Sequence, residues 1–195
     1  MNNINYNTFL IEAKEEWKNW KRLGDSILHI NLRDWADLAL IAPLSAHTLS
    51  KISNGLCDDP LSSCLRAWDF GHGCRQGKPI ILAPAMNTAM WIHPLTTRQL
   101  DTIQGFWNFD PKDDDNNNSK SISNVLLHGE MDNISTEKFG SSIEGGHIDL
   151  GKSGVWVIKP QKKTLACGEV GDGALASVDE IVKMVKLSLN TYFKP

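Results

Sequence analysis

Short, continuously apolar runs alternate with amphipathic segments along most of the chain. The runs at 38–41, 79–83 and 155–158 are typical of strands that are buried on both faces of a parallel sheet. Apolar residues at three- and four-residue spacing predict helices at about 8–22, 46–54, 60–68, 96–104 and 178–189. Strands that alternate with helices predict an α/β protein with three layers and a parallel sheet.

The stretch from about residue 108 to 153 differs from the rest of the chain in composition. Residues 112–120 read KDDDNNNSK, and Ser, Asn, Gly and Glu dominate as far as about residue 154. So few apolar residues cannot form a packed core. We expect one domain over residues 1–195 that carries a largely disordered surface insertion here.

Charge and cysteine content exclude several classes of function. A net charge of −3 over 195 residues provides no basic field for nucleic acid or an anionic membrane surface. The first residues lack the apolar core of a signal peptide and a run long enough to span a bilayer, which favours a cytoplasmic location. The 4 cysteines form no C-x-x-C pair, so no metal site is predicted and free thiols are expected.

Three polar motifs, at 43–48, 84–90 and 166–173, follow predicted strands. Ligands of parallel α/β sheets bind at the carboxyl ends of the strands. Ser45 and Thr48 place hydroxyl groups beside a helix N-terminus, which suits an anionic or oxygen-rich group. The same two residues would serve equally as an ordinary helix cap.

Three further side chains are candidates for chemistry. The amide of Asn87 could orient a carboxylate or a flavin edge, or it could cap a helix. His29 could serve as a general base or an orienting donor, although a lone histidine is more often structural. Cys167 lies in a Gly-rich stretch from which a thiol could reach into a site.

Taken in order, these motifs resemble a known family. The segments LHINLRDWADLALIAPLSAHT, RAWDF, KPIILAPAMNTAMW and LACGEVGDGALA are similar to those of phosphopantothenoylcysteine decarboxylases, which are flavin-dependent cysteine decarboxylases. The resemblance covers about residues 15–105 and 155–187. It implies a flavodoxin-like fold, FMN as cofactor, and a homotrimer or mixed trimer whose active sites lie between subunits.

The resemblance also implies a reaction and its residues. The reaction is decarboxylation of 4′-phosphopantothenoylcysteine to 4′-phosphopantetheine in coenzyme A synthesis. The implied catalytic residues are His29, Asn87 and Cys167. The implied flavin contacts are Ser45, Ala46, His47, Thr48 and Ala85, and the implied substrate contacts are Arg33, Asn87, Met90 and Lys163.

The chain departs from the family pattern in four places. Nothing before Asn31 matches the Gly/Ser-rich turn that holds the FMN phosphate, so the sheet is expected to lack its first strands. His47, Asp34 and Thr164 stand where the family has Asn, Arg and a basic residue. The alternative function is a regulatory subunit that binds a Ser/Thr protein phosphatase. Having all three catalytic residues in one chain favours the enzyme.

Overall fold

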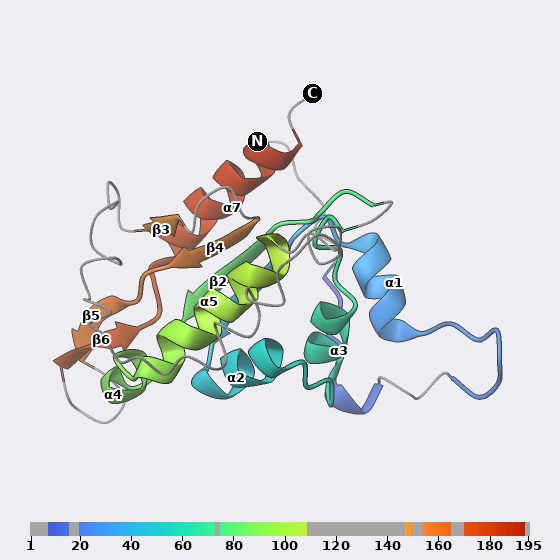
Figure 1. The fold of residues 1–195 in the computed structure, drawn as a ribbon, viewed down its shortest axis with the longest axis horizontal. Coiled ribbons are helices and arrows are strands. Elements are labelled where there is room, and N and C mark those ends of the chain that lie inside the picture. Colours follow the sequence, from blue (N-terminus) through green and yellow to red (C-terminus); the bar gives the residue numbers. More distant parts are fainter. Residues whose placement is uncertain are drawn as a thin grey trace, which may run out of the picture.

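The computed structural model describes residues 8–15, 20–72, 75–108, 147–149, 154–164 and 170–193. Within these residues the main sheet has the strand order β1, β2, β4, β3, formed by Ala39–Leu44, Ile80–Pro84, Val155–Ile158 and His147–Asp149 (Figure 1). β1, β2 and β4 are mutually parallel, and β3 pairs antiparallel to β4. The predicted α/β class with a parallel sheet is confirmed.

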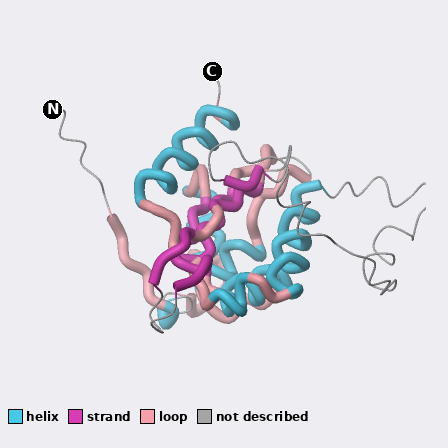
Figure 2. Tube along the Cα trace, turned by 90° about the vertical axis from the view of Figure 1, so that its left-hand side faces the viewer, coloured by secondary structure: helices cyan, strands magenta, loops and turns pink. Residues whose placement is uncertain are grey.

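Helices cover both faces of this sheet (Figures 1 and 2). One face carries three helices, α2, α3 and α5, formed by Ala46–Asn54, Pro60–Arg66 and Pro94–Asn108. Leu49, Leu65 and Ile103 of these helices share a buried cluster with Leu82 and Val157 of the sheet. Together with the helix on the opposite face, they complete the three predicted layers.

That opposite face is covered by α7, Val178–Tyr192. Ile181 and Met184 of this helix pack with Ile81 and Trp156, whose side chains leave the sheet on this side. Successive residues of a strand point to opposite faces, so β2 and β4 supply both clusters. Every residue of these two strands is buried, as the continuous apolar runs predict.

The edge strand β1 is less buried than predicted. Its burial alternates irregularly, and Leu40 is 41% exposed. Among the described residues β1 pairs only with β2, so helices and strands cover it less completely than they cover the central strands.

Most predicted helices are confirmed because their ends carry clear stop and start signals. α2 spans the predicted range and ends at Gly55, whose φ of 71° is the left-handed conformation that favours glycine. α3 begins at Asp59, which accepts a hydrogen bond from the Ser62 amide at 2.8 Å. α5 and α7 both extend a few residues beyond their predicted ends.

The predicted N-terminal helix over 8–22 is wrong where the structure describes it. Only a single 3₁₀ turn forms there, at Ala13–Glu15. Phe9 and Leu10, which belong to the predicted apolar face, are 77% and 86% exposed. An isolated short helix is marginal in water without a surface that buries its apolar face, and this segment finds none among the described residues.

Several elements were not predicted as such. His29 and Arg33 lie on a helix, α1, formed by Leu28–Trp35. The Gly-rich stretch contains a strand, β6 (Val170–Ala174), which forms an antiparallel hairpin with β5 (Gln161–Thr164). The predicted insertion lies largely outside the described residues, but β3 falls within its range. No helix in the described ranges has the length and apolar character needed to cross a bilayer.

Candidate functional site at the carboxyl end of the sheet

The turn after β1 combines a helix cap with groups that remain accessible. The Ser45 hydroxyl accepts a hydrogen bond from the Thr48 amide at 3.1 Å and lies 3.0 Å from the Thr48 hydroxyl. Helix geometry leaves the amides of Ala46 and His47 without an intrahelical acceptor. The hydroxyls of Ser45 and Thr48 and the amides of Ala46 and His47 therefore lie together at the positive end of α2. Ser45 and His47 are exposed. The capping role is therefore shown, and the remaining donors at this helix end could also bind an anionic ligand.

The turn after β2 lies directly beside it. The Ala85 amide donates to the Leu44 carbonyl at 2.9 Å, which joins the two turns at one edge of the sheet. Asn87 caps the short helix α4 (Thr88–Trp91), where its Oδ1 accepts from the Ala89 amide at 2.8 Å. Asn87 and Met90 are both exposed at this edge. The motifs that follow β1 and β2 therefore meet at one edge of the sheet.

Thr88 adds a group that the sequence analysis missed. Its hydroxyl is buried and has no hydrogen-bond partner among the described residues. A buried hydroxyl normally finds a partner, so this one marks a polar position in the Asn87 turn that a bound group or water would complete. No spacing rule distinguishes such a threonine from an ordinary residue at a helix start.

The β5–β6 hairpin reaches the same edge of the sheet. The Met86 amide donates to the Gly173 carbonyl at 2.9 Å, and α4 packs against β6 (Figure 1). Lys163, on β5, is exposed and pairs with Gly171 across the hairpin. Cys167 lies between the two strands, outside the described residues, so its predicted role stays a prediction.

A second anchor ties the hairpin to α7. The Glu180 carboxylate accepts hydrogen bonds from the Gln161 amide at 2.8 Å and from the Ser177 amide at 3.0 Å. Gln161 and then Ser177 hold the pKa of Glu180 below its usual range, because each donates to the ionised form. The same carboxylate thereby caps α7 and holds the base of the hairpin.

His29 and Arg33 lie elsewhere. The Ala39 amide donates to the Pro79 carbonyl, and Lys78 contacts the end of α1, so this helix lies at the amino end of β1 and β2. Figure 1 places α1 on the right of the molecule, and α4 and the hairpin on the left. Within one chain the structure therefore does not bring His29 and Arg33 together with Asn87.

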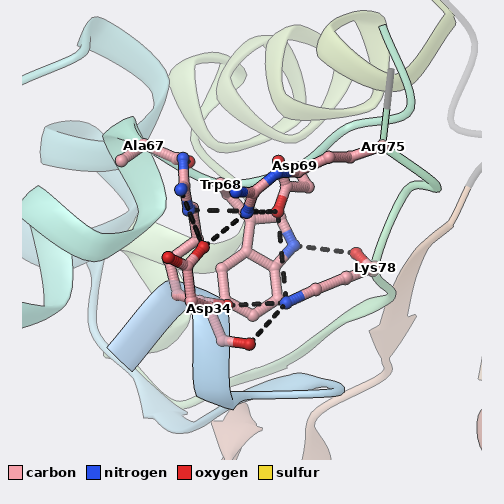
Figure 3. A network of polar contacts seen from close by, with 7 residues as sticks. Asp34, Ala67, Trp68, Asp69, Arg75 and Lys78 are labelled. Carbon is pink, nitrogen blue, oxygen red and sulfur yellow. Dashed lines mark hydrogen bonds and ion pairs between the residues drawn. The ribbon is translucent and has the colours of Figure 1, made fainter. Parts of the chain in front are cut away.

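A compact ionic network that includes Asp34, Asp69, Arg75 and Lys78 lies at this amino end (Figure 3). Arg33 belongs to it through its guanidinium group. Its guanidinium lies 2.7 Å from the Asp34 carboxylate, 3.4 Å from the Ala67 carbonyl and 3.9 Å from Asp69. Arg75 bonds the same oxygen of Asp34. Arg75 and then Arg33 lower the pKa of Asp34 by donating to its carboxylate.

Asp69 and Lys78 complete the network. One Asp69 oxygen is buried without a hydrogen bond among the described residues, yet it has cationic nitrogens of Arg75 at 3.7 Å and Lys78 at 4.0 Å. Lys78 donates to the Arg33 carbonyl at 2.7 Å, which neutralises the negative end of α1. The sequence analysis missed Asp69, Arg75 and Lys78, because no local pattern joins residues so far apart in the chain.

The described cysteines form no cluster. Cys57 is exposed and Cys64 is half-buried; Cys74 lies outside the described residues. In the part of the chain that is described, no group of three or more His, Cys, Asp or Glu side chains could hold a metal ion. The expectation of no metal site stays a prediction.

The fold and the polar carboxyl edge define an α/β protein of the class that binds a ligand beyond the ends of its parallel strands. Comparison with known proteins identifies the group within that class. Residues 3–126 match the family model described as Flavoprotein. The chain belongs to this flavoprotein family.

Similar proteins carry consistent names. The chain is 37% identical over 194 residues to a phosphopantothenoylcysteine decarboxylase of Oryza sativa, covering 97% of the chain and 64% of that protein. The corresponding mouse protein is 35% identical over 183 residues, covering 94% of the chain and 64% of the relative. The chain thus spans less than two thirds of the length of these relatives.

Solved structures agree with the fold. A PPC decarboxylase mutant complexed with pantothenoylaminoethenethiol has a TM-score of 0.62 and 34% identity, covering 91% of this chain and 68% of the other. The FMN-binding protein AtHal3 has a TM-score of 0.59 and 34% identity, covering 93% of this chain and 69% of the other. The flavodoxin-like fold implied by the resemblance is confirmed.

Proposed function

We propose that this protein carries out the FMN-dependent decarboxylation of 4′-phosphopantothenoylcysteine to 4′-phosphopantetheine, a step of coenzyme A synthesis. The observation that carries the proposal is the joined pair of turns at the carboxyl end of the sheet. There the hydrogen bond from Ala85 to Leu44 joins the turn that carries the Ser45 and Thr48 hydroxyls to the turn that carries Asn87. The names of the relatives and of the solved neighbours support the same activity.

The residues of the first turn fit an FMN. Ser45, Ala46, His47 and Thr48 offer hydroxyl and amide donors at a helix N-terminus, and Ala85 adds a small side chain beside them. Such donors suit the carbonyl, ribityl and phosphate oxygens of a flavin nucleotide. Bound FMN would supply the two-electron chemistry that makes loss of the substrate carboxylate easy.

The residues of the second turn would orient the substrate. Asn87 holds its side chain in a fixed direction by capping α4, so its amide is preorganised toward a substrate carboxylate. The exposed Met90 would cover the apolar part of the substrate, and Lys163 would attract its phosphate. Cys167 would supply the proton that completes the product.

His29 would act from a second copy of the chain. In one chain α1 lies at the amino end of the sheet, and α4, which Asn87 caps, lies at the carboxyl end (Figure 1). A trimer whose sites lie between subunits would place His29 and Arg33 of one copy against Asn87 of the next. The homotrimer or mixed trimer is thus part of the proposal.

The activity is tested by two measurements on the purified protein. With FMN present, flavin fluorescence should be quenched on binding, and carbon dioxide should be released from 4′-phosphopantothenoylcysteine. A folded protein that neither quenches FMN nor releases carbon dioxide would contradict the proposal.

The shared site is tested by mixing two impaired variants. His29→Asn and Asn87→Ala should each keep only a low residual rate alone, and co-refolded mixtures should regain activity because some sites combine an intact His29 with an intact Asn87. No recovery, in mixtures shown by co-purification through two different affinity tags to be hetero-oligomers, would place both residues in one chain's site.

The regulatory alternative stays a prediction, as does the cytoplasmic location. No observation of the described residues favours binding to a protein phosphatase. The wild type and the variants His29→Asn and Asn87→Ala can be compared as inhibitors of a Ser/Thr phosphatase. Equal inhibition by all three would show that regulation does not depend on the decarboxylase residues.

A further inference from the structure

Gly173, on β6, makes a backbone contact that leaves no room for a side chain. Its carbonyl accepts the Met86 amide at 2.9 Å. A Cβ at this position would lie 1.8 Å from the Met86 carbonyl oxygen, 3.0 Å from its carbon and 3.3 Å from the Asn87 carbonyl carbon. The φ of Gly173 is not in the left-handed range, so space rather than backbone conformation requires glycine here.

We propose that Gly173 is a positioning residue that sets the orientation of Asn87 in the reaction, an inference that rests on the proposed function of Asn87. The Met86 amide is bonded to Gly173, and the Met86 carbonyl oxygen occupies the space that a Cβ at position 173 would need. These contacts fix the peptide group between Met86 and Asn87. The cap of α4 fixes the side chain from the other direction, because Asn87 Oδ1 accepts the Ala89 amide.

The contact differs from the other tight glycine contacts of the described residues. Gly77 and Gly154 abut the Trp107 ring, where an added Cβ would come within 2.6 Å and 2.2 Å of ring carbons. Those two positions shape the core around an aromatic side chain. At Gly173 the opposing atoms are backbone atoms of the site itself, so an added methyl group must move the Met86–Asn87 turn or the hairpin.

Gly173→Ala tests the proposal, with Gly105→Ala as the matched control, because a Cβ at Gly105 meets nothing within 4 Å. Gly173→Ala should break the Met86 hydrogen bond and raise the exchange rate of the Met86 amide at least about 10-fold. A displacement of about 1 Å can cost about 100-fold in rate, so kcat should fall by about that factor while KM changes only a few-fold. Gly105→Ala should change neither quantity.

A double mutant separates positioning from general damage. If Gly173 acts through Asn87, adding Gly173→Ala to Asn87→Ala should lower kcat by less than about 3-fold, because the side chain it orients is already absent. Full additivity of the two effects would overturn the proposal. So would an unchanged kcat in Gly173→Ala when the Met86 amide exchanges rapidly.

Two further measurements keep the inference distinct from the proposed function. If the wild type releases no carbon dioxide, the proposed function fails. The positioning role can then still be tested through the NMR resonance of the Asn87 side-chain amide. This resonance should shift in Gly173→Ala and stay unchanged in Gly105→Ala. If Gly173→Ala does not fold, Gln161→Ala loosens the hairpin without adding atoms. It should accelerate Met86 exchange and lower kcat a few-fold; unchanged Met86 exchange and kcat would overturn the proposal.

Discussion

The two ends of the parallel sheet use their polar residues differently. At the amino end, three cations and two carboxylates, Arg33, Arg75, Lys78, Asp34 and Asp69, lie within 4.0 Å of one another or of the end of α1. At the carboxyl end, Ser45 and Asn87 cap helices and remain exposed. Charge at the amino end is satisfied internally, whereas the carboxyl end presents hydrogen-bonding groups outward.

This difference separates residues that stabilise the fold from residues that are available to bind a ligand. A side chain whose partners lie within the chain mainly stabilises the fold, and removing it leaves its partners unsatisfied. A side chain that caps a helix and still faces outward is preorganised for a ligand. Substitutions of Asp34, Asp69, Arg75 or Lys78 should therefore lower stability, and those at the carboxyl end should lower activity. Arg33 belongs both to the network and to the proposed shared site, so its substitution should lower both.

The largest expected effect is that of Asn87→Asp on activity. An aspartate caps a helix as well as asparagine does, so the bond to the Ala89 amide and the stability should be kept. The substitution removes the amide donors and adds a negative charge, so kcat/KM should fall about 100-fold, the cost of one lost donor at an active site. Steady-state kinetics and thermal unfolding measure the two quantities. A large loss of stability with unchanged kcat/KM would show that Asn87 stabilises the fold and does not serve the reaction.

Asp69→Asn should have the next largest effect, and on stability instead. The substitution conserves size but leaves Arg33, Arg75 and Lys78 facing a neutral group, so the free energy of unfolding should fall by about 2 kcal/mol. Asp58→Asn is the matched control, because Asp58 is 66% exposed in its pair with Lys51 and should contribute less than about 1 kcal/mol. Equal losses for the two variants in urea unfolding would show that the network adds nothing.

How well the sequence predicted these regions depended on how local their interactions are. The bounds of α2 and β4 follow from the Ser45 cap, the Gly55 stop and a continuous apolar run, all of which lie within a few residues. The carboxyl-end motifs were found in the same way, because strand, turn and helix start are contiguous. The resemblance then assigned them roles that periodicity alone could not.

Long-range contacts explain what the sequence analysis missed. The network joins Asp34 to Arg75 and Lys78, more than 40 residues away, and no spacing rule predicts such a pair. The predicted helix at 8–22 failed for a related reason. Its period was suitable, but Phe9 and Leu10 find no surface to bury against among the described residues.

Ser45→Ala and Ser177→Ala remove two similar helix caps, one inside the proposed flavin turn and one outside it. Each serine hydroxyl accepts a backbone amide, from Thr48 and Glu180 respectively, so each substitution should cost about 1 kcal/mol of stability. Only Ser45 belongs to the proposed flavin turn, so only Ser45→Ala should also weaken FMN binding, as measured by fluorescence titration. Equal FMN affinities in the two variants would remove Ser45 from the flavin site.

The smallest expected effect is the acid dependence of the amino-end network. Arg75 and then Arg33 hold the pKa of Asp34 below its ordinary value of 3.8, so the folded protein binds this proton less readily than the unfolded chain. The stabilisation is therefore fully present above pH 3.8 and is lost as the pH falls through the lower folded value. The difference in urea midpoint between wild type and Asp34→Asn should stay constant from about pH 7 to about pH 5 and shrink only in stronger acid. A difference that vanishes already near neutral pH would mean that another group, not the Asp34 carboxylate, holds Arg75 against α1.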